Sequence, residues 1–241
     1  FMQEIPSSFA IAFSLLGSLD ADLMEIVGLS IRVSLFAVGL SLLIGLPAGA
    51  AIAIGRFPGR FGLIVISNSL MGMPPVVIGL LVYLGLSRTG PFGVLGLLYT
   101  PTAMVIAQTF LITPIVIALA RQTIEELNSE YAEYFASIAI SLRYRVMTLL
   151  WEGRYGLMTV CLAGFGRAIS EVGAVMIVGG NIDHLTRVMT TAIALETSKG
   201  DLELAMALGI ILMLLALMVN LLLALIRPTE SFGKKNAAAT Y

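Results

Sequence analysis

The stretch RAISEVGAVMIVGGNI, residues 167–182, places two charged side chains, Arg167 and Glu171, in an otherwise apolar run. Residues four apart share one face of a helix, so these side chains can form an ion pair. An isolated charge inside a bilayer costs roughly 2.5–3.5 kcal/mol, and such residues nearly always face the bundle interior or an aqueous cavity. The pair therefore predicts a helix that lines a translocation route or the seam that closes it. A lock between helices with no transport role is the alternative.

Polar and helix-breaking residues in the other apolar runs extend this candidate pathway. An anion route needs hydrogen-bond donors more than carboxylates, which leaves Glu171 as a counter-charge for Arg167. Prolines inside spans remove a backbone donor, and lipid tolerates this only where protein or water satisfies the freed carbonyls. Pro47 fits a packing kink more readily than the Pro74-Pro75 pair does. The candidate pathway residues are Pro74, Pro75, Val76, Thr113, Pro114, Arg167, Ser170, Glu171, Gly173 and Asn181.

Residues that would support an enzyme or a metal site are few. The single cysteine, Cys161, and the single histidine, His184, cannot build a Cys/His metal site together. No aspartate lies inside an apolar run, and neither a Gly-x-Ser-x-Gly motif nor a glycine-rich Lys-Ser/Thr phosphate loop occurs. We therefore expect no catalysis, no metal and no cofactor bound by this chain, and an intramembrane hydrolase is disfavoured.

The elements that position these residues are expected to be membrane helices. Of 241 residues, 58% are hydrophobic and 12% are charged, and the mean hydropathy is +0.97. A spanning helix needs about 20 apolar residues. Segment 9–19 is too short to cross and is expected at the membrane interface, and it lacks the basic start and cleavage site of a signal peptide. We predict an all-α transmembrane helix bundle with five spans: 29–54, 61–86, 101–120, 155–180 and 202–226.

The distribution of basic residues predicts the orientation in the membrane. Nine Lys or Arg residues fall in segments 55–60 and 121–154 and in the tail from 227, against three on the other side, so the N-terminus is expected outside and the C-terminus in the cytoplasm. The expected organisation is an external segment 1–28, a permease domain 29–227 and a cytoplasmic tail 228–241. The formal net charge of −1 and the absence of basic runs give no reason to expect a nucleic-acid partner.

The longest cytoplasmic segment, 121–154, has an amphipathic pattern. Tyr131, Phe135, Ile138 and Leu142 recur at helical spacing, and acidic residues precede basic ones. The apolar stripe could cover the membrane surface, the protein's own spans or a docked subunit. A helix on lipid would favour a basic polar face, so the acidic start favours a protein groove.

Several stretches together resemble the permease subunits of ATP-binding-cassette (ABC) importers for oxyanions. They are this amphipathic segment, residues 149–182 (LLWEGRYGLMTVCLAGFGRAISEVGAVMIVGGNI) and residues 185–212 (LTRVMTTAIALETSKGDLELAMALGIIL). The resemblance covers nearly the whole chain and is strongest to tungstate and molybdate permeases, particularly the short five-span tungstate type. It implies a prokaryotic cytoplasmic membrane, a homodimer of this chain, two cytoplasmic ATPase subunits that bind ATP and Mg, and an external solute-binding protein. Sulfate or phosphate permeases, and an ion-coupled secondary transporter, remain alternatives.

The resemblance also implies a coupling helix that docks on the ATPase, although the family's Glu-Ala-Ala motif is degenerate here. One alignment places Glu133 at the acid, Tyr134 and Phe135 at the alanines and Ala139 at the glycine; the other uses Glu130, Ala132 and Ala136. The candidate coupling residues are Glu130, Ala132, Glu133, Phe135, Ala139, Ser141 and Arg143. The external connection 181–201 is expected to meet the binding protein through Asp183, Arg187, Glu196 and Lys199.

Overall fold

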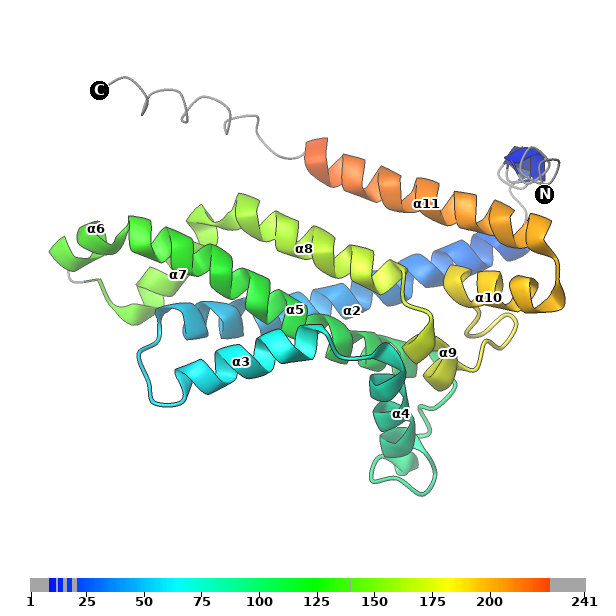
Figure 1. Ribbon diagram of the computed structural model, residues 1–241, viewed down its shortest axis with the longest axis horizontal. Coiled ribbons are helices and arrows are strands. Elements are labelled where there is room, and N and C mark those ends of the chain that lie inside the picture. The colour runs from blue at the N-terminus through cyan, green and yellow to red at the C-terminus, as the bar shows by residue number, and fades with distance from the viewer. Residues whose placement is uncertain (1–8, 12, 15–16, 19–20, 139, 226–241) are drawn as a thin grey trace.

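The computed structural model describes residues 9–11, 13–14, 17–18, 21–138 and 140–225, with the backbone alone at 223 and 224. Over these residues the chain is helical and contains no strand, which confirms the predicted all-α bundle (Figure 1). The helices are α2 (Ala21–Ile54), α3 (Arg60–Met71), α4 (Pro75–Leu86), the 3-10 turn η1 (Gly93–Leu95), α5 (Pro101–Glu130), α6 (Ala132–Ser137), α7 (Leu142–Glu152), α8 (Arg154–Ile169), α9 (Gly173–Gly179), α10 (Met189–Lys199) and α11 (Leu202–Leu225).

By length and composition, the helices provide up to five membrane spans, two of which are broken. Helices α2, α5 and α11 are each long and apolar enough to cross. The α3–α4 pair bends by 100° and the α8–α9 pair by 57°, and each pair counts as one further span. The first bend follows from Pro74 and Pro75, because Pro75 is the first residue of α4 and neither proline can donate to the preceding turn.

Two helix boundaries differ from those expected. Helix α2 begins at Ala21, so the expected boundary between residues 28 and 29 lies inside it. Helix α5 continues to Glu130, so the expected loop 121–154 begins within a helix. The described positions of segment 9–19 are helical, and its place at the membrane interface stays a prediction. Ala139 and the tail 228–241 lie outside the described residues.

The centre of the bundle is the contact between α2 and α5. Gly45 and Gly49 of α2 face α5 so closely that a Cβ at Gly49 would lie 2.8 Å from the carbonyl oxygen of Ile117. This approach buries Ala37, Val38, Ile112 and Val116 in one core. Pro47 and Pro114 lie within continuous helices here, consistent with tight packing of neighbouring backbones that tolerates a proline.

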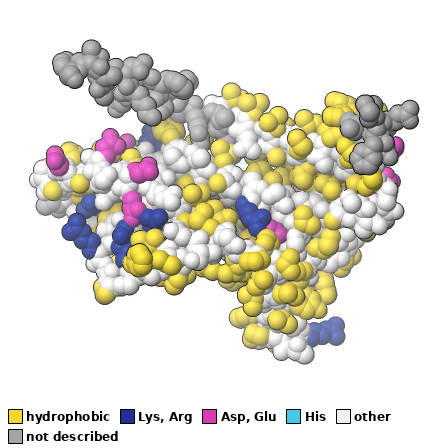
Figure 2. Space-filling model, viewed as in Figure 1, with side chains coloured by type: hydrophobic (Ala, Val, Ile, Leu, Met, Phe, Trp, Pro, Cys, Tyr) yellow, Lys and Arg dark blue, Asp and Glu magenta, His cyan; other side chains and the backbone are white. Residues whose placement is uncertain are grey.

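The two ends of the bundle differ in their polar surface. Figure 2 shows hydrophobic side chains across the middle of the molecule and over α4, whereas acidic and basic side chains gather at the end formed by α6 and α7. The opposite end carries α10 and the start of α11 (Figure 1). Of the helices with a span's length, α11 is the least buried, so most of its apolar surface remains available to lipid or to another chain.

Candidate functional site

The ion pair expected at the α8–α9 bend is present. Arg167 Nη1 lies 2.8 Å from Glu171 Oε2, and the Glu171 side chain is only 3% exposed, against 31% for Arg167. Helix α8 ends between the two residues, at Ile169. The backbone N–H of Glu171 still donates to Ala168 O at 3.2 Å, so the side chains of Arg167 and Glu171 stay on the same side of the chain. The spacing therefore predicted the pair correctly, although not the break in the helix.

Glu171 links three helices at this bend. Its Oε1 accepts a hydrogen bond from the backbone N–H of Ala174 at 3.1 Å, in the first turn of α9, where a carboxylate favours the positive end of the helix. Its backbone carbonyl accepts a bond from Thr190 Oγ1 of α10 at 2.8 Å. With both carboxylate oxygens engaged, Glu171 holds the bend in one geometry, while Arg167 is the more accessible partner.

Two polar residues that the sequence analysis did not select complete the bend. Gln108 of α5 donates from Nε2 to Ala168 O at 3.0 Å, and Thr190 donates to Glu171 O. A broken membrane helix weakens the hydrogen bonding of its last carbonyls, and these side chains add a donor to Ala168 O, which also accepts from Glu171 N–H, and to Glu171 O. Gln108 and Thr190 also line, with Ser30 and Ser34, a space of about 10 Å³ beside Glu171. An amide side chain within the apolar run 101–120 was the available signal for Gln108.

The α3–α4 bend meets the α8–α9 bend directly. A Cβ on Gly79 of α4 would lie 2.8 Å from Ala174 Cα, and a Cβ on Gly173 would lie 3.1 Å from the side chain of Val76. The structure therefore brings together Pro74, Pro75, Val76, Gly173 and the ion pair, all of which were expected in the pathway. Ser170 lies at the same bend, exposed, with its hydroxyl donating to Gly166 O at 2.8 Å.

Three other expected pathway residues lie elsewhere. Thr113 Oγ1 donates to Thr109 O at 2.7 Å and contacts Ser41 Oγ at 3.3 Å, so it belongs to the α2–α5 contact. Pro114 is buried in α5. Asn181 follows α9 in a left-handed conformation with φ of 50°, which asparagine tolerates better than most residues. Sequence spacing could not separate these residues from the bend, because helix packing decides which ones meet.

Arg32 is a charged residue in α2 that the sequence analysis left aside. It is exposed, and it makes no hydrogen bond or ion pair with any residue that the structure describes. With Phe36, Pro101 and Thr102 it lines a groove of about 430 Å³ at the start of α5. A charge inside a predicted span was the signal for it.

The expected single amphipathic helix in 121–154 is wrong. Helix α6 ends at Ser137 and α7 begins at Leu142, so the apolar stripe is divided. Phe135 is 3% exposed and packs in the protein's own core, with the Arg145 guanidinium 5.3 Å from its ring centroid. Phe135 is therefore an anchor that holds α6 against the bundle, whereas Tyr134, Ile138 and Leu142 are exposed.

The remaining expected coupling residues lie around this anchor. Glu130 ends α5, Ala132 and Glu133 begin α6, and all three are exposed. Ser141 precedes α7 and makes no side-chain cap hydrogen bond, and Arg143 is exposed in the first turn. This end therefore offers an exposed acidic and aromatic surface on α6, followed by a basic start of α7.

The expected external connection 181–201 is mostly helix rather than a loop. Helix α10 occupies Met189–Lys199, and its first turns are buried. Asp183 pairs with Arg187 at 2.5 Å, and Glu196 pairs with Lys199 at 2.8 Å, so each charge predicted for partner contact is matched by a near neighbour.

His184 and Glu25 form a further polar contact at this end. His184 Nδ1 lies 2.8 Å from Glu25 Oε2 of α2. The bond to Glu25, together with the charge of Asp183, raises the pKa of His184 above its ordinary value.

Comparison with known proteins gives relatives over most of the chain. A probable anion ABC transporter permease protein of Haloferax volcanii is 40% identical over 86% of this chain and 92% of its own. The tungstate uptake system permease protein TupB of Peptoclostridium acidaminophilum is 38% identical over 91% of this chain and 96% of its own. A sulfate transport system permease protein of Synechococcus elongatus is 27% identical over 70% of this chain and 62% of its own. No protein-family model matches. Identities of 38–40% over most of both chains show that this chain belongs to the family of ABC transporter permeases for anions.

Proposed function

We propose that this chain is the membrane-spanning subunit of an ABC importer for an oxyanion, and that the oxyanion is tungstate or the chemically similar molybdate. The observation that carries the proposal is the 38% identity to a tungstate uptake permease over nine tenths of both chains. Sulfate permeases, at 27% identity, are more distant, which disfavours sulfate as the substrate.

The bends supply a physical basis for alternating access. Two spans break where they touch, and Gln108 and Thr190 donate hydrogen bonds to carbonyls at one of these breaks, Ala168 O and Glu171 O. Hinges of this kind move rigid segments about a few residues. Arg167, partly exposed beside the buried Glu171, gives the moving seam a cationic side chain that favours a passing anion over a cation.

The partners follow from the same assignment. Two copies of this chain would form the pathway, two cytoplasmic ATPase subunits would supply ATP and Mg chemistry, and an external binding protein would deliver the anion. The exposed surface of α6 is the proposed ATPase contact, since Phe135 fixes the helix and leaves Tyr134 and Ile138 outward. The α10 end, with Asp183, Arg187, Glu196 and Lys199, is the proposed contact for the binding protein. The chain would lie in a prokaryotic cytoplasmic membrane with its N-terminus outside.

An ion-coupled secondary transporter is the competing function, because broken helices and a paired charge suit it equally well. The two differ in their need for an ATPase. Affinity purification of the tagged chain from native membranes should recover an ATPase subunit, and tungstate uptake should stop when ATP is depleted. Uptake that follows an ion gradient, with no ATPase recovered, would instead establish the secondary transporter.

The docking surface can be tested in the same preparation. Tyr134→Ala with Ile138→Asp should remove the ATPase from the purified material, because both side chains are exposed on or beside α6 and neither holds the core. Phe92→Ala with Val94→Ala, two exposed apolar residues in the connection from α4 to α5, is the matched control and should retain the ATPase. Equal recovery with both double variants would contradict docking through α6.

A further inference from the structure

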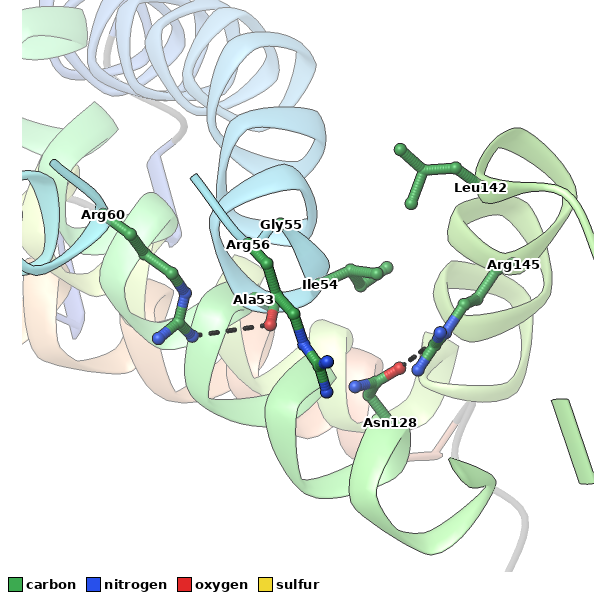
Figure 3. A pocket seen from close by; sticks show the side chains of 8 residues that line it. All are labelled: Ala53, Ile54, Gly55, Arg56, Arg60, Asn128, Leu142 and Arg145. Atoms are coloured by element: carbon green, nitrogen blue, oxygen red, sulfur yellow. Dashed lines mark hydrogen bonds between the residues drawn. The ribbon is translucent and has the colours of Figure 1, made fainter. Parts of the chain in front are cut away.

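A cavity with a basic lining lies at the α6–α7 end of the molecule. It measures about 590 Å³ and is bounded by the end of α2, the start of α3, α5 and α7. Among the residues that the structure describes, its polar lining consists of Arg56, Arg60, Arg145 and Asn128, without a carboxylate. Figure 3 shows Arg56 and Arg145 reaching toward Asn128 from opposite sides. The cavity is separate from the bend that holds Arg167 and Glu171.

Positive charge exceeds negative charge around this cavity. Glu125 pairs with both Arg60 and Arg121, so one carboxylate serves two guanidinium groups. Arg145 donates from Nε to Asn128 Oδ1 at 2.8 Å, a neutral partner, and Arg56 has no hydrogen bond or ion pair with a described residue. Like charges held around a concave surface repel one another and attract anions to it.

Backbone groups of both polarities border the cavity. Arg60 Nε donates to Ile52 O at 2.8 Å, which satisfies the carbonyl end of α2 where it opens on the cavity. The first residues of α3 and α7, Arg60 and Leu142, both line the cavity, so the N-termini of two helices border it, although the backbone N–H of Arg60 already donates to Phe57 O at 3.3 Å.

We propose that this cavity is a binding site for a phosphate-class tetrahedral oxyanion. A planar carboxylate is matched by one guanidinium fork, whereas a tetrahedral group presents oxygens in several directions and can bridge Arg56 and Arg145, which approach Asn128 from opposite sides. The group can be a free oxyanion on the cytoplasmic side or the phosphate of an anionic lipid headgroup. Both sources use the same chemistry, and the volume accommodates either.

The cytoplasmic placement of this end rests on the proposed function, but binding to the purified chain does not. Failure to bind phosphate would leave the importer assignment intact. Failure to recover an ATPase would leave the anion site intact.

The free-anion source is tested by titrating inorganic phosphate into the full-length chain in detergent. Arg56→Gln should weaken binding about tenfold or more, the loss expected when a charged hydrogen bond is removed. Arg56 is exposed and makes no hydrogen bond or ion pair with a described residue, so Arg56→Gln should not lower the melting temperature in the absence of phosphate. Arg88→Gln removes an exposed arginine that does not line the cavity, and it should bind phosphate as the wild type does.

The lipid source is tested by native mass spectrometry of the chain extracted from bilayers of equal parts phosphatidylcholine and phosphatidylglycerol. Wild type and Arg88→Gln should retain phosphatidylglycerol, and Arg56→Gln should lose it. A second variant, Asn128→Asp, places a carboxylate between Arg56 and Arg145. It should raise the melting temperature in the absence of phosphate and abolish the further rise that phosphate gives the wild type.

The effects of Arg56→Gln distinguish the two sources. Loss of phosphate binding alone assigns the site to a free oxyanion, and loss of lipid retention alone assigns it to the headgroup. Loss of both supports a site that binds either. If neither probe distinguishes Arg56→Gln from wild type, the proposal is wrong. If Arg56→Gln loses only the ATPase, the cavity is part of a protein contact and the proposal is overturned as well.

Discussion

At the scale of single residues, Glu171 is the most buried of the charged side chains that the structure describes. Because it is buried and bonded to Arg167, to α9 and to α10, Glu171→Gln should strand the Arg167 charge and lower stability by about 2–3 kcal/mol. Arg167→Gln should cost a similar amount, and the double variant less than the two single variants added. Thermal unfolding of all four proteins measures this interaction. Additive costs would show that the pair contributes no coupling.

The transport readout of the same four proteins separates two roles of Arg167. A structural lock predicts that the double variant, once assembled, transports tungstate. A role in contacting the anion predicts normal assembly with no transport, since Arg167 is the exposed partner. Loss of both assembly and transport in the double variant would favour the lock.

His184 gives a pH dependence whose sign follows from its partners. Its pKa is raised, chiefly by the bond to Glu25 and then by Asp183 and Glu25 as charges, with Asp22 adding to them. A raised folded-state pKa stabilises the fold fully below the ordinary value of 6.5, and this contribution is lost as the pH rises through the folded-state value.

The difference in melting temperature between wild type and His184→Gln should therefore be largest near about pH 5.5 and vanish by about pH 9. Glu25→Gln should abolish most of it. A difference that grows with pH would mean that the protonated histidine does not bind Glu25.

At the scale of helices, the contact between the two bends depends on the absence of a side chain at Gly79. Gly79→Ala should force α4 away from α9, because the new Cβ would lie 2.8 Å from a backbone atom, Ala174 Cα, that cannot rotate aside. We expect a loss of about 1–3 kcal/mol and impaired uptake. Gly209→Ala in α11 is the control: its Cβ meets nothing within 4 Å, so helix propensity should raise stability by up to about 1 kcal/mol. Equal behaviour of the two variants would show that the bends need not touch.

The sequence predicted which segments are helices better than where those helices bend or end. Hydropathy located all five apolar runs, because burial in lipid depends on composition over about 20 residues. Hydropathy missed the extension of α5 to Glu130, because the last turns of this helix are polar. Within them, Glu125 pairs with Arg121 of the same helix and with Arg60 of α3. Hydropathy also missed the end of α6, where Phe135 turns inward.

The same limit applies to the site. The Arg167–Glu171 pair was predictable because its partners are four residues apart. The bonds from Gln108 and Thr190 were not, because those partners are 60 and 19 residues away and meet only through packing.

At the scale of the whole molecule, the two ends carry different surfaces. The α6–α7 end holds most of the described arginines. The α10 end, which lies opposite in Figure 1, holds ion pairs whose charges neutralise one another. The positive-inside rule then predicts that α6 lies in the cytoplasm and α10 outside. Two serines offer matched positions for a test: Ser137 of α6 and Ser198 of α10 are both exposed, and each donates its hydroxyl to a carbonyl three residues earlier at 2.7 Å.

In a Cys161→Ser background, Ser198→Cys should react with a membrane-impermeant maleimide in intact cells, whereas Ser137→Cys should react only after permeabilisation. The substitution of serine by cysteine is small and both sites are exposed, so local chemistry is the same and only membrane sidedness differs. Labelling is read by gel shift against the Cys161→Ser parent, which supplies the background. If Ser137→Cys reacted in intact cells and Ser198→Cys only after permeabilisation, the topology would be the opposite of the predicted one. The proposed contacts of the ATPase and of the binding protein would then have to exchange ends.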